Sequence, residues 1–188
     1  MRSRELRRRS VANRGAARLA SSAIVCLCVL AASGCAMTDR GANFKIDDRL
    51  RFEAPASRSL VKLPTTVKWT MKDFRSAAPE TEPARADAGY FAVFVDRAPV
   101  ASGETLKAVA SGDRICLRDP GCPNDSYLQQ RHIYTTTDTS IDLPSVLPNV
   151  GSDDLQLHTI IVVLMDTAGH RVGESAWQLD VWIRKAGT

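Results

Sequence analysis

Residues 157–183 read L-H-T-I-I-V-V-L-M-D-T-A-G-H-R-V-G-E-S-A-W-Q-L-D-V-W-I, and this stretch decides the fold. Its first part, Leu157 to Met165, is strongly hydrophobic and predicts a buried strand. Turn residues follow from Asp166 to His170. From Trp177 to Arg184, apolar residues alternate with polar ones, which is the period of a half-buried strand. The stretch therefore predicts a β-hairpin.

Shorter strand patterns precede the hairpin. They occur at Leu50–Phe52, Thr66–Lys72, Tyr90–Asp96, around Val100 and at Thr139–Leu143. Tyr90–Asp96 is apolar on both faces, so we expect it to be a central strand. We expect a mobile loop at residues 76–88, a short helical turn at residues 125–131, and no long amphipathic helix. About seven short strands separated by turns predict an all-β, antiparallel β-sandwich.

Three runs resemble the fibronectin type III family. Residues 65–70, T-T-V-K-W-T, resemble strand B, in which a buried tryptophan ends an alternating stretch. Residues 139–148, T-S-I-D-L-P-S-V-L-P, resemble strand E and the E–F corner, and residues 158–175 resemble the F–G hairpin. The resemblance implies a fibronectin III-like or immunoglobulin-like sandwich.

Two features depart from that pattern. His158 and Thr159 stand in the early F strand, where the family has a tyrosine. The segment from Ala101 to Tyr134 is longer than the family's C–E connection. An immunoglobulin domain proper is less well supported, because Cys116 and Cys122 are too close in sequence to join two sheets.

The first 34 residues have the order of a secretory signal peptide: seven arginines, an apolar core, then small residues. The core is shorter than the roughly 20 residues that a membrane-spanning helix needs. Ala32-Ser33-Gly34-Cys35 then resembles the bacterial lipobox, with Ala32 in the place of the usual leucine. The resemblance implies cleavage before Cys35 and diacylation of its sulfur. The alternatives are an ordinary secreted protein and a twin-arginine leader containing Arg8-Arg9.

These features predict a cleaved signal peptide at residues 1–34, a lipidated tether at 35–44 and a β-sandwich domain at 45–188. The leader holds seven of the 25 basic residues and one of the 21 acidic ones, so the remainder has a net charge of −2. A domain without a basic surplus lacks the electrostatic footprint of a nucleic-acid-binding protein. We therefore expect no nucleic-acid partner.

Cys116 and Cys122 are the cysteines that remain beyond Cys35. They flank an Asp119-Pro120-Gly121 turn in a chain that we expect to be exported, which predicts a local disulfide and a rigid surface loop. A metal site is the alternative, but no cluster of further ligands accompanies the two cysteines. We expect no metal and no cofactor.

The sequence offers little sign of catalysis. Motifs such as G-x-S-x-G and H-E-x-x-H are not present. A strand about 30 Å long separates His158 from His170, so these two cannot hold one metal ion, and His132 would have to pair with one of them alone. All three histidines are interpreted as surface or turn residues. Asp153-Asp154 could help to bind calcium, but solvated loop carboxylates are the simpler interpretation. We expect a protein that is not an enzyme.

Two surfaces are candidates for partner binding. Trp182 alternates in step with the polar residues of its strand, so it belongs to the outward face. There it either anchors a partner or is covered by the N-terminal segment or by residues 101–134, which we call the insertion. The insertion offers the second group of candidates. These are Tyr127, Arg131, His132 and Tyr134.

The sequence predicts a lipoprotein of the cell envelope, anchored through Cys35 on the extracytoplasmic face of a membrane, which is the outer membrane in a diderm cell. We expect a non-catalytic binding or envelope-assembly module whose partner is an envelope protein or a glycan. The alternative is a cell-wall or carbohydrate-active enzyme, or its accessory subunit, that uses residues 101–134. A flat apolar patch around Trp182 would favour the binding module, and a deep pocket or clustered carboxylates would favour the enzyme.

Overall fold

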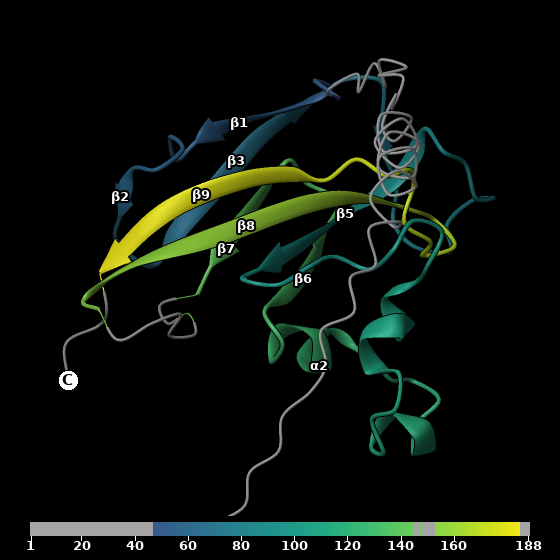
Figure 1. Cartoon of the computed structure of the whole chain (residues 1–188). Helices are drawn as coiled ribbons and strands as arrows, with labels where there is room; N and C mark the ends of the chain where they lie inside the picture. The colour runs from purple at the N-terminus through teal and green to yellow at the C-terminus, as the bar shows by residue number, and fades with distance from the viewer. Residues whose placement is uncertain (1–46, 145–146, 148–152, 185–188) are drawn as a thin grey trace, which may run out of the picture. The chain divides into compact units, whose positions relative to one another are not determined.

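The computed structural model describes residues 47–144, 147 and 153–184. These residues form a sandwich of two sheets (Figure 1). The smaller sheet has the order β1–β3–β7 and is antiparallel throughout. Its strands are β1 (Leu50–Ala54), β3 (Thr65–Met71) and β7 (Ser140–Leu143).

The larger sheet has the order β2–β9–β8–β5–β4, and β6 also pairs with β5. Its strands are β2 (Leu60–Val61), β4 (Arg75–Ser76), β5 (Ala88–Val95), β6 (Ile133–Thr136), β8 (Leu155–Asp166) and β9 (Trp177–Arg184). Two short strands pair in parallel with their neighbours, β2 with β9 and β4 with β5, and the other pairs of this sheet are antiparallel. Among the described residues, seven strands have four residues or more. The predicted all-β sandwich is confirmed.

Strands β8 and β9 form the expected hairpin, paired from Leu155 with Arg184 to Val162 with Trp177. In the turn, the Asp166 carboxylate accepts a bond from the His170 N–H at 2.8 Å, and the Asp166 carbonyl accepts one from the Gly169 N–H at 3.0 Å. Gly169 has a φ of +84°, a conformation that side chains disfavour. This turn brings Arg171 opposite Met165, and the ladder of β8 and β9 resumes after residues 173–176, where Trp177 pairs with Val162.

The main core lies between the two sheets. Trp69, predicted at the inward end of an alternating stretch, is 1% exposed and packs edge-on against Phe91 with ring centroids 5.3 Å apart. The alternating residues of β8 and β9 complete this core from the larger sheet. Its buried members on these two strands are Ile160, Val162, Leu164, Trp177, Leu179, Val181 and Ile183.

A second core lies on the outer face of the larger sheet, where residues 101–134 cover one part of it. This segment contains the short helices η2 (Leu106–Ala110), η3 (Cys116–Arg118) and α2 (Asp125–Gln129), which lie below the sheet in Figure 1. Because the second core covers its outer face, every residue of β5 is buried. The predicted central strand and the helical turn at α2 are confirmed.

Two local expectations need correction or refinement. The strand predicted around Val100 is not formed, because Val100 instead packs as a buried residue of the second core. The loop predicted at residues 76–88 is shorter by one residue at each end, because Ser76 belongs to β4 and Ala88 to β5. Residues 77–87 are mostly exposed, but a hydrogen bond from the Thr167 hydroxyl to the Glu82 carbonyl, at 2.8 Å, ties this loop to the hairpin. The mobility of this loop stays a prediction.

The predicted signal peptide, the lipobox-like sequence and the predicted tether lie outside the described residues, so they stay predictions. Within the described part of the chain, no helix has the length and apolar character needed to cross a bilayer.

Candidate binding surfaces

An apolar row crosses the uncovered part of the larger sheet. Leu60 on β2 pairs with Trp182 on β9, and Trp182 pairs with Leu157 on β8. Directly paired residues share a face of a sheet, and Val181 and Ile183 point into the core, so this row faces outward. We call Leu60, Leu155, Leu157 and Trp182 the Trp182 row.

The row is open to solvent in spite of its composition. Leu60 is 62% exposed, Leu155 40% and Leu157 39%. Trp182 itself is half-buried, with β2 running in parallel beside it. Exposed apolar side chains that cluster, unlike those scattered singly, mark interaction sites. The parity of the last strand pointed to Trp182, but sequence reasoning missed the three leucines around it.

A polar network borders the row on the next pair of residues along β8 and β9. The Thr159 hydroxyl donates to the Asp180 carboxylate at 3.0 Å, and the Gln178 amide donates to the same oxygen at 2.8 Å. The Thr159 N–H donates to the Asp96 carboxylate at 2.9 Å. The Trp182 row is therefore flanked by side chains whose positions are fixed by hydrogen bonds.

His158 differs from its expected position, because it is not a surface residue. It is 2% exposed and lies on the core-facing side of β8. Its Nδ1 is 2.7 Å from the Asp96 carboxylate. An ionised carboxylate only accepts, so Nδ1 of His158 donates. This arrangement of His and Asp is also found in catalytic triads, but in the described residues no hydroxyl or thiol is hydrogen-bonded to His158. The pair ties the end of β5 to β8.

Tyr127 and Arg131, two of the predicted partner-binding residues, contact each other within the insertion. The Arg131 guanidinium lies 3.5 Å from the centre of the Tyr127 ring, and both side chains donate to the Asp113 carboxylate. The Ile115 N–H and the Tyr127 hydroxyl, with Arg131 nearby, lower the pKa of Asp113. Burial raises the pKa of Tyr127. These contacts organise the insertion, and a role in partner binding stays a prediction.

Tyr134 and His132, the other two, lie at the start of β6. Tyr134 is half-buried, and this burial raises the pKa of its hydroxyl. The same side chain lines a groove of about 230 Å³ between α2, β6 and β7. The groove is mixed in character, with two carboxylates, an amide and several apolar side chains. Its lining residues are Asp125, Leu128, Gln129, Ile133, Tyr134, Thr135, Ile141 and Asp142. His132 has a φ of +56°, and its buried Nδ1 has no partner among the described atoms.

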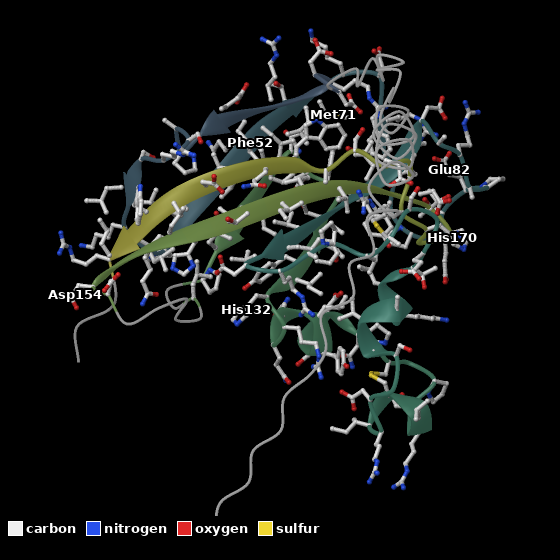
Figure 2. All side chains as sticks on the ribbon, viewed as in Figure 1. Phe52, Met71, Glu82, His132, Asp154 and His170 are labelled. Carbon is white, nitrogen blue, oxygen red and sulfur yellow. A yellow bond between two sulfur atoms is a disulfide. The ribbon has the colours of Figure 1, made fainter. Side chains whose placement is uncertain are left out.

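The predicted disulfide joins Cys116 and Cys122. It closes the loop at the end of the insertion that lies away from the sheets (Figure 2). Both cysteines are half-buried against the second core. The loop is thus fixed at its base.

No metal site forms in the described part of the chain, where no three His, Cys, Asp or Glu side chains come together. Asp154 and His170 mark the two ends of β8 in Figure 2, so His158 and His170 are far apart, as expected. Asp153 and Asp154 are exposed.

The sequence contains one hydrolase-like spacing, S-x-x-K, at Ser59-Leu60-Val61-Lys62. Its central residues form strand β2. Side chains three residues apart in a strand point to opposite faces, whereas the chemistry needs Ser and Lys to meet. The Ser59 hydroxyl instead donates to the Ala56 carbonyl at 2.6 Å.

Comparison with known protein families, with curated proteins and with solved structures found no match to this chain. The geometry of the described residues is therefore the basis for the functional proposals.

Proposed function

We propose that this protein is a bacterial lipoprotein, tethered through an acylated Cys35, whose sandwich domain is a non-catalytic binding or envelope-assembly module. The proposal of a lipid anchor rests on the lipobox-like sequence Ala32-Ser33-Gly34-Cys35 that follows an arginine-rich, apolar leader. The disulfide between Cys116 and Cys122 supports export, because such bonds persist in oxidising compartments.

The Trp182 row is the observation that carries the binding function. Five large apolar side chains of the described residues are exposed, and three of the five lie beside Trp182. Burial of one large aliphatic side chain stabilises a complex by roughly 1.5–3 kcal/mol, and tryptophan is enriched among the residues that dominate interfaces. An exposed apolar row with a polar border matches the core and rim of an interface.

Intact mass tests the anchor. The protein is extracted from membranes beside a Cys35→Ala variant. The proposal expects a chain that begins at Cys35 and is heavier by a diacylglyceryl group. An unlipidated, soluble product would contradict the anchor.

Co-isolation after cross-linking in the producing cells tests the binding surface. The parent chain is compared with Leu157→Ser and Trp182→Ser, and Lys68→Ser serves as the control because Lys68 is exposed on β3. The proposal expects a defined envelope protein or glycan that co-isolates with the parent and the control but is depleted at least tenfold from both row variants. Equal recovery from all four chains would exclude the row as the binding surface.

A second candidate function is action on a cell-wall or carbohydrate substrate, favoured by the groove between α2, β6 and β7. Its two carboxylates, Asp125 and Asp142, are the residue type that glycoside hydrolysis uses in pairs. The Thr66 hydroxyl donates to Asp142 at 2.6 Å, which holds that carboxylate in place. Release of sugars from purified cell wall, lost in both Asp125→Asn and Asp142→Asn, would support this candidate.

A further inference from the structure

The short helix η3 and the two residues before it carry the two most exposed large apolar side chains in the described part of the chain. We call these residues, 114–118, the tip of the insertion. Ile115 is 73% exposed and Leu117 is 75% exposed. Every other exposed large apolar side chain of the described residues belongs to the Trp182 row. The tip lies in the insertion, so it is a separate surface that the partner-binding proposal does not explain.

The backbone under these side chains is ordered. The Leu117 N–H donates to the Asp113 carbonyl at 3.0 Å, and the Ile115 N–H donates to the Asp113 carboxylate at 2.9 Å. The same carboxylate is fixed by Tyr127 and Arg131. Ile115 and Leu117 are therefore presented on a stapled turn, and binding through them needs little further ordering of the chain.

Two arginines flank the apolar pair. Arg114 and Arg118 are exposed, and no described carboxylate forms an ion pair with either of them. The nearby Asp119 carboxylate accepts a bond from the Gly121 N–H at 2.9 Å. The tip thus combines unpaired positive charge with exposed aliphatic side chains, which is the chemistry that binds the surface of an anionic bilayer.

The size of the tip favours a membrane over a protein partner. A stable protein interface uses about 800 Å² on each side, or some 20–30 residues, whereas this patch consists of four side chains. Shallow insertion of two aliphatic residues beside two arginines needs no larger surface.

The chain length also fits this occupant, on the premise of the lipid anchor proposed above. Eleven residues separate Cys35 from Asp47, the first described residue, and the twelve steps from Cys35 to Asp47 reach at most about 40 Å. Asp47 is then held within that reach of the membrane, so the domain is confined near the lipid surface and its tip has a high effective concentration there.

We propose that the tip of the insertion, through Arg114, Ile115, Leu117 and Arg118, docks on the surface of an anionic membrane. The acyl chains supply the anchoring, and the contact of the tip fixes the orientation of the sandwich relative to the bilayer. The Trp182 row then faces a defined direction in the envelope.

The test uses a local readout in the full chain, reconstituted into vesicles of anionic or zwitterionic phospholipid that contain a brominated lipid. A Leu117→Trp variant reports contact of the tip with the acyl region through quenching of its added fluorescence. Lys68→Trp is the matched control, because Lys68 is exposed on the smaller sheet. The Arg114→Gln and Arg118→Gln changes are then added to Leu117→Trp.

We expect the tryptophan at position 117 to be quenched in anionic vesicles and the one at position 68 not to be. Neutralising both arginines should weaken docking by about 25-fold, at roughly fivefold for each. Equal quenching at positions 117 and 68 would overturn the proposal. So would quenching at position 117 that depends neither on the two arginines nor on lipid charge, or a tryptophan at position 117 that is unquenched by lipid and becomes shielded from solvent only when envelope proteins are added. The mass measurement reports lipidation separately, so failure of the anchor and failure of the docking are distinguishable.

Discussion

Removal of the Asp96 carboxylate should strongly destabilise the sandwich. This side chain is 10% exposed, lies 2.7 Å from the buried Nδ1 of His158 and accepts the Thr159 N–H at 2.9 Å. In Asp96→Ala, two buried donors lose their acceptor, at about 1–3 kcal/mol each. The residue also has a φ of +55°, which costs alanine roughly 1 kcal/mol more than aspartate or glycine. The free energy of unfolding should therefore fall by about 3–7 kcal/mol.

Urea unfolding, followed by the fluorescence of buried tryptophan, measures this loss. Asp96→Gly should be about 1 kcal/mol more stable than Asp96→Ala, because glycine accepts the positive φ. Asp96→Asn keeps an acceptor and should lie between the parent and both of these variants. A double-mutant cycle with His158→Leu isolates the contribution of the pair. A loss below 1 kcal/mol for Asp96→Ala, or no coupling to His158, would refute this reasoning.

Three further predictions concern stability. Hydrogen bonds from Arg49 and Ser175 outweigh burial and hold the pKa of Asp47 well below its ordinary 3.8. The ionised Asp47 therefore adds about 1–2 kcal/mol to the free energy of unfolding above pH 5, and this is lost as the pH falls towards the lowered pKa. In Asp47→Asn, stability should depend less steeply on pH in the acid range. Burial, with the nearby Asp166 and Asp125 charges, raises the pKa of Tyr90 to about 12, so stability should fall by roughly 2–3 kcal/mol as the pH rises from 10 to 12, and less in Tyr90→Phe. In Gly89→Ala the new Cβ would overlap the Met165 carbonyl oxygen, so this variant should not fold or should lose more than about 4 kcal/mol of unfolding free energy. The control is Gly103→Ala, where the Cβ meets open space at a φ of +76° and the loss should be about 1 kcal/mol. Thermal unfolding measures both.

The sequence predicted the elements whose signal is local. Alternation placed Val67 and Trp69 in the core, and turn residues placed the hairpin at Asp166–His170. The parity of the final strand also put Trp182 on the outer face. Each of these depends on neighbours within a few residues, where the period of a strand is directly legible.

Contacts between distant residues could not be predicted in this way. Asp96 and His158 are 62 positions apart, so a histidine that resembles a surface residue in sequence becomes a core residue only once β5 and β8 pair. Leu60 lies on a two-residue strand that is too short to show alternation.

Buried Arg171 was missed for a similar reason. Its guanidinium donates to the carbonyls of Val100, Glu174 and Ser175, and burial lowers its pKa. A cation whose terminal nitrogens are bound by backbone carbonyls leaves no complementary acidic residue to find in the sequence. The insertion that covers β5 and the hairpin that carries Arg171 meet only in the folded chain.

Site-specific photocross-linking from the Trp182 row tests the central claim most directly. A photoreactive amino acid replaces Leu157 in the full chain within the producing cells, and the same substitution at Lys68, exposed on the opposite sheet, is the control. A binding module that uses this row should form an adduct of defined mass from position 157 but not from position 68, and Trp182→Ser should weaken the adduct at least tenfold. No adduct from position 157, or the same adducts from both positions, would contradict the account.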